Sequence, residues 1–219
     1  MAESNCLPES FYNQPVVQVA QDLLGMRLVR VINNTRVEGI ILETEAYQGE
    51  EDLACHAHVG LTRRNAIMYG PPGRAYVYFT YGMHWLLNCV CERQGFPAAV
   101  LIRALLPVNG LEEIAERRSG RPQPQWMDGP AKICQAMDID GQQNGVNLTL
   151  VADNLFIENS TPALDGRIIA SPRIGINQVP EPWLSIPWRF QVDPIIFQQR
   201  DNLDPYRIIS SPTNKSFRG

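Results

Sequence analysis

Lysine is scarce in this sequence: Lys132 and Lys215 are the only two among 19 basic residues. Schiff-base catalysis needs a side-chain amine and therefore has few candidates here. Almost all positive charge is carried by arginine, whose planar guanidinium binds phosphate through paired hydrogen bonds. With 44% hydrophobic and 19% charged residues over 219 positions, the composition is otherwise that of an ordinary globular protein. This length allows a stable core without disulfides or a structural metal.

Long apolar stretches are also absent. Even the apolar stretch 98–108 is interrupted by Arg103 and falls short of the ~20 residues that a membrane-spanning helix needs. The N-terminal region lacks an apolar signal-peptide core and carries acidic residues instead. We therefore expect a soluble, intracellular protein with no membrane partner.

The five cysteines are odd in number and irregularly spaced, which argues against a secreted disulfide framework. The motif Cys55-His56-Ala57-His58, together with His84 and the pair Cys89 and Cys91, raises the alternative of a metal site. Zinc sites favour two to four residues between cysteines and three to five between histidines, and neither spacing occurs. We predict no metal and no cofactor.

Charge is unevenly distributed along the chain. The overall net charge of −4 argues at first against a nucleic-acid partner. Residues 1–61 carry a net charge of −6, whereas residues 62–103 contain five arginines and one acidic residue, a net of +4. A polyanion responds to the local patch more than to the total, so the basic segment keeps DNA or RNA open as a partner.

The hydrophobic pattern predicts one α+β domain with a mainly antiparallel sheet. Strands are expected at 27–32, 37–47, 74–81, 84–91, 98–106, 150–157, 168–176 and 188–192, and helices at 15–24, 109–118 and 129–137. Two further signals are a turn at 33–36 and a capping box at the start of the second helix, formed by Asn109 and Glu112. We divide the chain into a loose lead-in at 1–14, a domain at 15–197 and a peripheral tail at 198–219.

Glu43 and Glu45 lie two residues apart in the expected strand 37–47, so their side chains share one face about 7 Å apart. Tyr47 follows on that face, and the opposite face is apolar. A carboxylate bordering a cleft can act as a general base for water. Alternate strand positions that face solvent are also often acidic, and the spacing alone leaves both interpretations open.

Tyr76 and Tyr78 share a face of the expected strand 74–81, and Tyr81 lies beside Gly82 at the turn of a hairpin. Tyrosine is a common strand former, which is the simple explanation. An aromatic side chain at an exposed hairpin tip also suits a wedge inserted into stacked bases. Both interpretations stay open at this point.

Several motifs in one order resemble the alkyladenine (3-methyladenine) DNA glycosylases of the mammalian type. They cover the chain from about Asp22 to Val192 and comprise Glu43-Thr44-Glu45-Ala46-Tyr47, Thr62 with Arg64-Asn65, Tyr76-Val77-Tyr78 with Tyr81-Gly82-Met83, Leu101-Ile102-Arg103-Ala104-Leu105, Gly129-Pro130 with Lys132-Ile133-Cys134-Gln135-Ala136, and Arg173-Ile174-Gly175. The resemblance implies a single domain around a curved antiparallel sheet with surrounding helices and a protruding β-hairpin. It also implies a monomer that uses no metal.

The resemblance further implies a role for each matching residue. Glu45 would activate the attacking water and Arg103 would hold that water or the carboxylate. Around the flipped base the resemblance places Tyr47, Tyr78, His56 and Asn88; at the DNA it places Tyr81 as the intercalating residue and Met68, Met83 and Arg64 as contacts.

The implied reaction is base-excision repair of double-stranded DNA containing damaged purines. An alkylated or deaminated purine is flipped out and its N-glycosidic bond is hydrolysed by an activated water, much as in glycoside hydrolysis. The scarcity of lysine favours a monofunctional enzyme without lyase activity. The chain lacks the long basic N-terminal extension of animal members, so we expect a bacterial protein of the cytoplasm, associated with the nucleoid. A DNA-binding module without catalysis and a metal hydrolase using Glu45, His56 and His58 are the alternatives.

Overall fold

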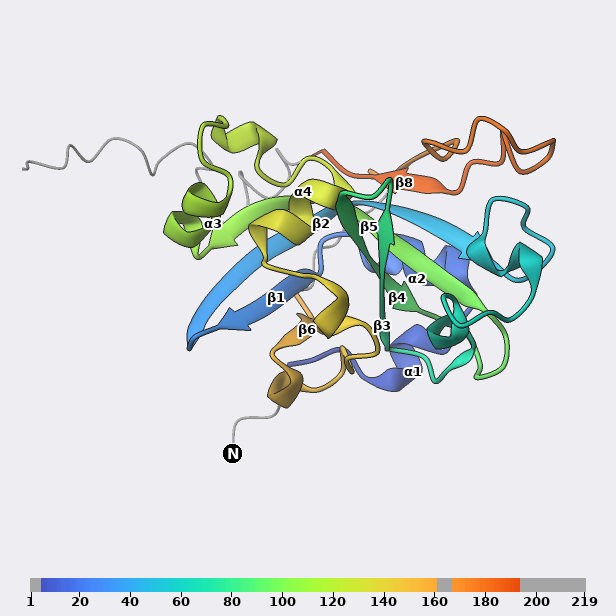
Figure 1. Cartoon of the computed structure of the whole chain (residues 1–219), viewed down its shortest axis with the longest axis horizontal. Helices are drawn as coiled ribbons and strands as arrows, with labels where there is room; N and C mark the ends of the chain where they lie inside the picture. The colour runs from blue at the N-terminus through green and yellow to red at the C-terminus, as the bar shows by residue number, and fades with distance from the viewer. Residues whose placement is uncertain (1–4, 161–166, 194–219) are drawn as a thin grey trace, which may run out of the picture.

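An antiparallel β-sheet of eight strands forms the centre of the computed structural model, which describes residues 5–160 and 167–193 (Figure 1). The strands are β1 Arg27–Ile32, β2 Thr35–Gln48, β3 Ala75–Thr80, β4 His84–Val90, β5 Ala98–Asn109, β6 Leu155–Glu158, β7 Ile169–Ser171 and β8 Arg189–Gln191. Their order is β3-β4-β5-β2-β1-β6, with β8 paired to β2 and β7 paired to β8. All of these pairings are antiparallel, so the predicted α+β class with a mainly antiparallel sheet is confirmed.

Strand β2 organises the sheet around the two carboxylates. It pairs with β5 along one edge, and its other edge is shared by β1 and, opposite Glu43–Glu45, by β8. The register between β2 and β5 shifts on both sides of Glu43, which marks a bulge. Bulges re-aim side chains beside functional sites. The segment carrying Glu43 and Glu45 therefore lies between two strands that each bring an arginine to it, Arg103 and Arg189.

Two hairpins follow the turn signals of the sequence. Asn33 and Asn34 connect β1 to β2 with φ angles of 49° and 66°, which asparagine tolerates better than most residues. The second hairpin, β3–β4, turns at Tyr81 and Gly82 with φ angles of 51° and 66°. Both hairpins are predicted from the sequence and confirmed.

Four α-helices surround the sheet in the described residues: α1 Glu9–Tyr12, α2 Val16–Asp22, α3 Leu111–Arg117 and α4 Pro130–Ala136. Helix α2 packs on β2 and β5, and α4 packs on β4 and β5. Pro130 opens α4 at its first position, where proline's missing N–H costs nothing. The expected helices are confirmed, and their packing joins β2, β5 and α4 into one core.

Four local expectations were wrong, the first being the strand expected at 168–176, because β7 ends at Ser171. The lead-in is not loose over residues 5–14, because it contains α1 and the fully buried Tyr12. Helix α3 is capped by Gly110 in a left-handed conformation, since the Asn109 side chain bonds instead to Glu38 and to the Gly110 N–H. Strand β6 is shorter than expected because residues 151–153 form a 3₁₀ turn. The expected tail at 198–219 lies outside the described residues.

Within residues 5–160 and 167–193, no helix combines the length and the hydropathy that crossing a bilayer requires.

Candidate active site

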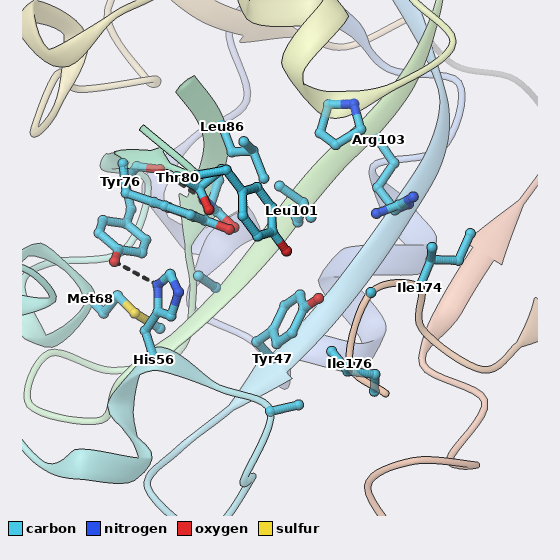
Figure 2. A pocket seen from close by; sticks show the side chains of 17 residues that line it. Tyr47, His56, Met68, Tyr76, Thr80, Leu86, Leu101, Arg103, Ile174 and Ile176 are labelled. Atoms are coloured by element: carbon cyan, nitrogen blue, oxygen red, sulfur yellow. Dashed lines mark hydrogen bonds between the residues drawn. The ribbon is translucent and has the colours of Figure 1, made fainter. Parts of the chain in front are cut away.

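A cavity of about 340 Å³ opens beside the β3–β4 hairpin (Figure 2). This volume lies at the lower end of the roughly 300–1,000 Å³ typical of small-molecule sites. Figure 2 shows His56 and Tyr76 on one side of the cavity, with Tyr47, Arg103 and Ile174 toward the other. Strands β2, β3, β4 and β5, the segment between β2 and β3, the hairpin turn, the start of α4 and the segment before β8 all contribute to its lining. The lining residues are Tyr47, Ala54, His56, Met68, Tyr76, Tyr78, Thr80, Tyr81, Leu86, Asn88, Ala99, Leu101, Arg103, Pro130, Ile174, Gly175 and Ile176.

Glu45 is fully buried directly behind the wall of this cavity. Its Oε2 atom accepts a hydrogen bond from the Tyr47 hydroxyl at 2.8 Å and lies 3.3 Å from Arg103 Nη1. Its Oε1 atom accepts from the Ile174 N–H at 2.7 Å. Burial raises the pKa of Glu45, while Arg103, the Ile174 N–H and the Tyr47 hydroxyl oppose that rise. All three of these donors line the cavity, so a carboxylate with a raised pKa borders it.

Glu43 completes the charge cluster. Its Oε1 atom accepts from Arg103 Nε at 2.8 Å and from Arg189 Nη1 at 3.1 Å. Burial by itself would lower the pKa of Arg103, but Glu45 and Glu43 outweigh it and the pKa is raised. Arg103 therefore stays charged and bridges the two carboxylates. The sequence places both carboxylates on one face, and the structure shows that this face meets arginines rather than open solvent.

The opposite side of the cavity is aromatic. His56 Nδ1 lies 2.9 Å from the Tyr76 hydroxyl, and the His56 ring packs edge-on against Tyr78 with centroids 4.4 Å apart. Burial lowers the pKa of His56 to about 4, with smaller contributions from Arg64 and His58. Burial raises the pKa of Tyr78 to about 12. At neutral pH this wall is uncharged and can stack against a planar ring.

Two predicted residues lie in the wall between these sides. Asn88 is buried, and its Nδ2 atom donates to the Tyr76 carbonyl at 3.0 Å. Met68 is only 2% exposed and packs with Tyr76 and Cys55. The expected position of Met68 near the DNA surface was therefore wrong, because its side chain lines the cavity instead, whereas its contact with DNA stays a prediction.

The hairpin tip is exposed. The side chains of Tyr81 and Met83 are 82% and 67% exposed, far more than apolar side chains in a packed strand. Arg64 is exposed beside β3 near the hairpin tip, donates to the Phe79 carbonyl at 3.2 Å and lies 5.4 Å from the Tyr78 ring centroid. Tyr81 also reaches the cavity rim. An exposed aromatic tip at the edge of an aromatic cavity suits insertion into a base stack.

Sequence reasoning missed the role of a buried ion pair beside the site. Arg173 donates from Nη1 and Nη2 to Asp52 at 2.5 and 2.9 Å, and both side chains are fully buried. Arg173 belongs to one of the motifs that resemble the glycosylase family, but the resemblance assigned it no role. No sequence pattern links it to Asp52. The Ile174 N–H on Glu45 was also missed, because a backbone donor leaves no mark on residue type.

The histidines and cysteines do not converge. His58 Nδ1 contacts the Cys55 carbonyl at 2.6 Å, whereas His56 Nδ1 faces Tyr76. Among the residues that the structure describes, no group of three or more His, Cys, Asp or Glu side chains is disposed to hold a metal ion.

A buried carboxylate, an arginine and an aromatic wall thus meet at one cavity. The family described as Methylpurine-DNA glycosylase (MPG) matches residues 10–194 of the chain. The chain therefore belongs to this family and is a DNA glycosylase, a hydrolase of DNA repair that acts on DNA.

Three proteins that are similar to this chain over most of their length are each named "Putative 3-methyladenine DNA glycosylase". The protein of Methanocella arvoryzae is 47% identical over 185 residues, which are 84% of this chain and 90% of the relative. That of Carboxydothermus hydrogenoformans is 46% identical over 184 residues, 84% and 93% of the two chains. That of Chlamydia felis is 43% identical over 188 residues, 84% and 94% of the two chains.

Proposed function

We propose that this protein excises alkylated or deaminated purines from double-stranded DNA by flipping the base into the cavity and hydrolysing its N-glycosidic bond. The observation that supports this most is that Arg103, Tyr47 and the Ile174 N–H each line the cavity and each contact the buried Glu45. A base in the cavity places its sugar near this carboxylate. The product is an abasic site, and with few lysines the enzyme has no lyase step.

Glu45 is the general base in this proposal. The attacking water lies in the cavity beside Arg103 and Glu45 Oε2, which contact each other directly at 3.3 Å, and it donates a hydrogen bond to the carboxylate. Glu45 takes a proton from this water. At the same time the water oxygen bonds to the sugar carbon, and the bond from that carbon to the purine breaks. A cationic alkylpurine leaves with the bonding electron pair as a neutral base. Arg103 stays charged and holds both the water and the carboxylate.

The aromatic residues hold the flipped base. Tyr47 and Tyr78 stack on its two faces, and rings with electron-rich faces favour cationic or electron-poor bases. With the Tyr76 hydroxyl donating to His56 Nδ1, the His56 Nε2–H is left to donate at the edge of the base. Asn88, in the buried wall, is positioned to exclude the 2-amino group of normal guanine.

The hairpin supports the duplex. Tyr81 fills the gap left by the flipped base, while Met83 and Arg64 contact the DNA. The enzyme acts as a monomer inside the cell.

One experiment tests the function as a whole. Release of free base is measured from methylated duplex DNA with the purified protein, in the presence of a metal chelator. We expect free 3-methyladenine and 7-methylguanine and an unbroken, abasic strand. Loss of release in chelator would favour a metal hydrolase, and tight binding without release would favour a DNA-binding module without catalysis.

A further inference from the structure

Asp52 and Arg173 form a fully buried ion pair that has no role in the proposed mechanism. The carboxylate of Asp52 also accepts hydrogen bonds from the Gln48 and Ala54 N–H groups. Arg173 also donates to the Ala46 and Trp183 carbonyls. Buried ion pairs are a poor source of stability, because removing two charges from water offsets most of their attraction. The position of this pair is therefore more informative than its presence.

The guanidinium of Arg173 lies behind a base-stacking ring. Its Cζ atom is 4.7 Å from the centroid of the Tyr47 ring and 5.3 Å from that of Trp188. Tyr47 lines the cavity and Arg173 does not, so the guanidinium covers the face of the ring that points away from the cavity. Figure 2 shows the cavity side of Tyr47, whose ring projects toward the space that a base would occupy.

A buried cation at this position acts on the cavity through the ring. A base stacked on the free face of Tyr47 lies two ring spacings, about 9 Å, from the guanidinium carbon. The Tyr47 ring lies between them in place of bulk solvent, so the field is only weakly screened. Arg64 beside Tyr78 is different, because it is exposed and its charge is screened by solvent.

The remaining charges near the cavity balance one another. Glu43 and Glu45 are contacted by two arginines, Arg103 and Arg189, which makes the cluster neutral overall. The Asp52 carboxylate makes the second pair neutral as well. Without it, one uncompensated positive charge would remain behind the ring on which the purine stacks.

We propose that Asp52 is a specificity-determining positioning residue: by neutralising Arg173 behind Tyr47, it allows the cavity to accept positively charged purines. This inference rests on the proposed function. Cationic bases such as 7-methylguanine need the neutralised pair, whereas a neutral base such as hypoxanthine is much less sensitive to it. The readout is therefore the ratio of the two single-turnover release rates, 7-methylguanine over hypoxanthine.

The test compares this ratio in wild type and variants. Asp52→Asn keeps the shape and removes the charge, and we expect the ratio to fall on the order of 10-fold. Adding Arg173→Gln removes the cation too and should restore the ratio to within about 3-fold of wild type, even where both absolute rates are lower. A ratio measured on one sample does not depend on the folded fraction. Asp52→Ser carries the same uncompensated guanidinium and replaces Asp52→Asn should the latter not fold.

Glu158→Gln is the matched control. Glu158 contacts Arg36 at 2.9 Å, and Arg36 lies over the Phe156 ring, but this pair is remote from the residues that line the cavity. Its ratio should equal that of wild type. An unchanged ratio in Asp52→Asn, or an equal fall when Arg173→Gln is added, overturns the inference. Wild-type protein that releases neither base instead overturns the proposed function.

Discussion

Arg103 Nη1 lies 3.3 Å from Glu45 Oε2, and this contact joins adjacent strands of the sheet at the wall of the cavity. The Arg103 side chain is 13% exposed and that of Glu45 is not exposed at all. The arginine therefore provides the side of the pair that meets the cavity. Water that reaches the carboxylate has to pass beside this guanidinium.

Replacing Glu45 by Gln should remove base release while preserving binding to damaged DNA. The amide keeps the shape of the side chain but cannot accept a proton from water. Single-turnover release should fall at least ~100-fold, the low end of general-base contributions. Glu43→Gln is the matched control. Glu43 also accepts a hydrogen bond from Arg103, but the Tyr47 hydroxyl and the Ile174 N–H bond to Glu45 instead. Activity retained in Glu45→Gln and lost in Glu43→Gln would assign the base to the other carboxylate.

The acidic limb of the pH–rate profile should lie above the pKa of an ordinary glutamate. Burial raises the pKa of Glu45, and the carboxylate must be ionised to act, so activity falls as pH drops through this raised pKa. Tyr47→Phe removes a donor that lowers the pKa, and the limb should move to higher pH. Tyr69→Phe is the control, since Tyr69 donates in the same way to Glu50 at 2.7 Å away from the cavity. A limb that moves equally in both variants would contradict this assignment.

His56 should not act as a general acid at neutral pH. Burial, followed by Arg64 and His58, lowers its pKa to about 4, so the imidazole is neutral near pH 7. We expect His56→Gln to slow hypoxanthine release no more than about 10-fold, as for the loss of one hydrogen bond. In the pH–rate profile for hypoxanthine release, the midpoint of the alkaline limb should be the same in His56→Gln as in wild type. The profile for 7-methylguanine release is measured in parallel for comparison. Selective disappearance of that alkaline limb for hypoxanthine would show that His56 donates the proton.

Tyr81→Ala should weaken activity on duplex DNA without destabilising the fold. Its side chain is 82% exposed, so little packing is lost, whereas a vacancy in the base stack is left unfilled. We expect a loss of about 1–3 kcal/mol in affinity for lesion-containing duplex, judged from base–aromatic stacking. Single-stranded substrate should be affected much less, and the melting temperature should stay near that of wild type.

Tyr78→Ala is the comparison for this prediction. Tyr78 packs against the His56 ring inside the cavity, so its loss should weaken recognition in duplex and single strand alike. Unfolding of Tyr81→Ala, or full duplex activity, would mean that Tyr81 is only a turn residue.

Local patterns explain what the sequence predicted correctly. The alternation in β2 places Glu43, Glu45 and Tyr47 on one face, and the tip of the β3–β4 hairpin follows from glycine beside an aromatic residue. Both features depend on neighbours two or three residues away. The family resemblance added Arg103, which adjoins these carboxylates across the strand pair.

The failures concern contacts that no local pattern records. The sequence around Met68 shows no clear periodicity, and its burial depends on the packing of Tyr76 and Cys55 around it. The pair of Asp52 and Arg173 spans 121 residues of sequence. The donor at Ile174 is a backbone N–H, which every residue except proline provides.

The Ile174 N–H on Glu45 has a consequence for synthesis of the protein on the ribosome. Glu45, the proposed general base, lies in β2. Its backbone donor Ile174 and the strand that carries Arg189 are translated more than a hundred residues later. A nascent chain that ends before Ile169 holds the six strands β1–β6 but lacks this donor and the β8 arginine. The carboxylate of such a chain lacks part of its hydrogen-bond set, so we expect excision activity only after translation has passed β8.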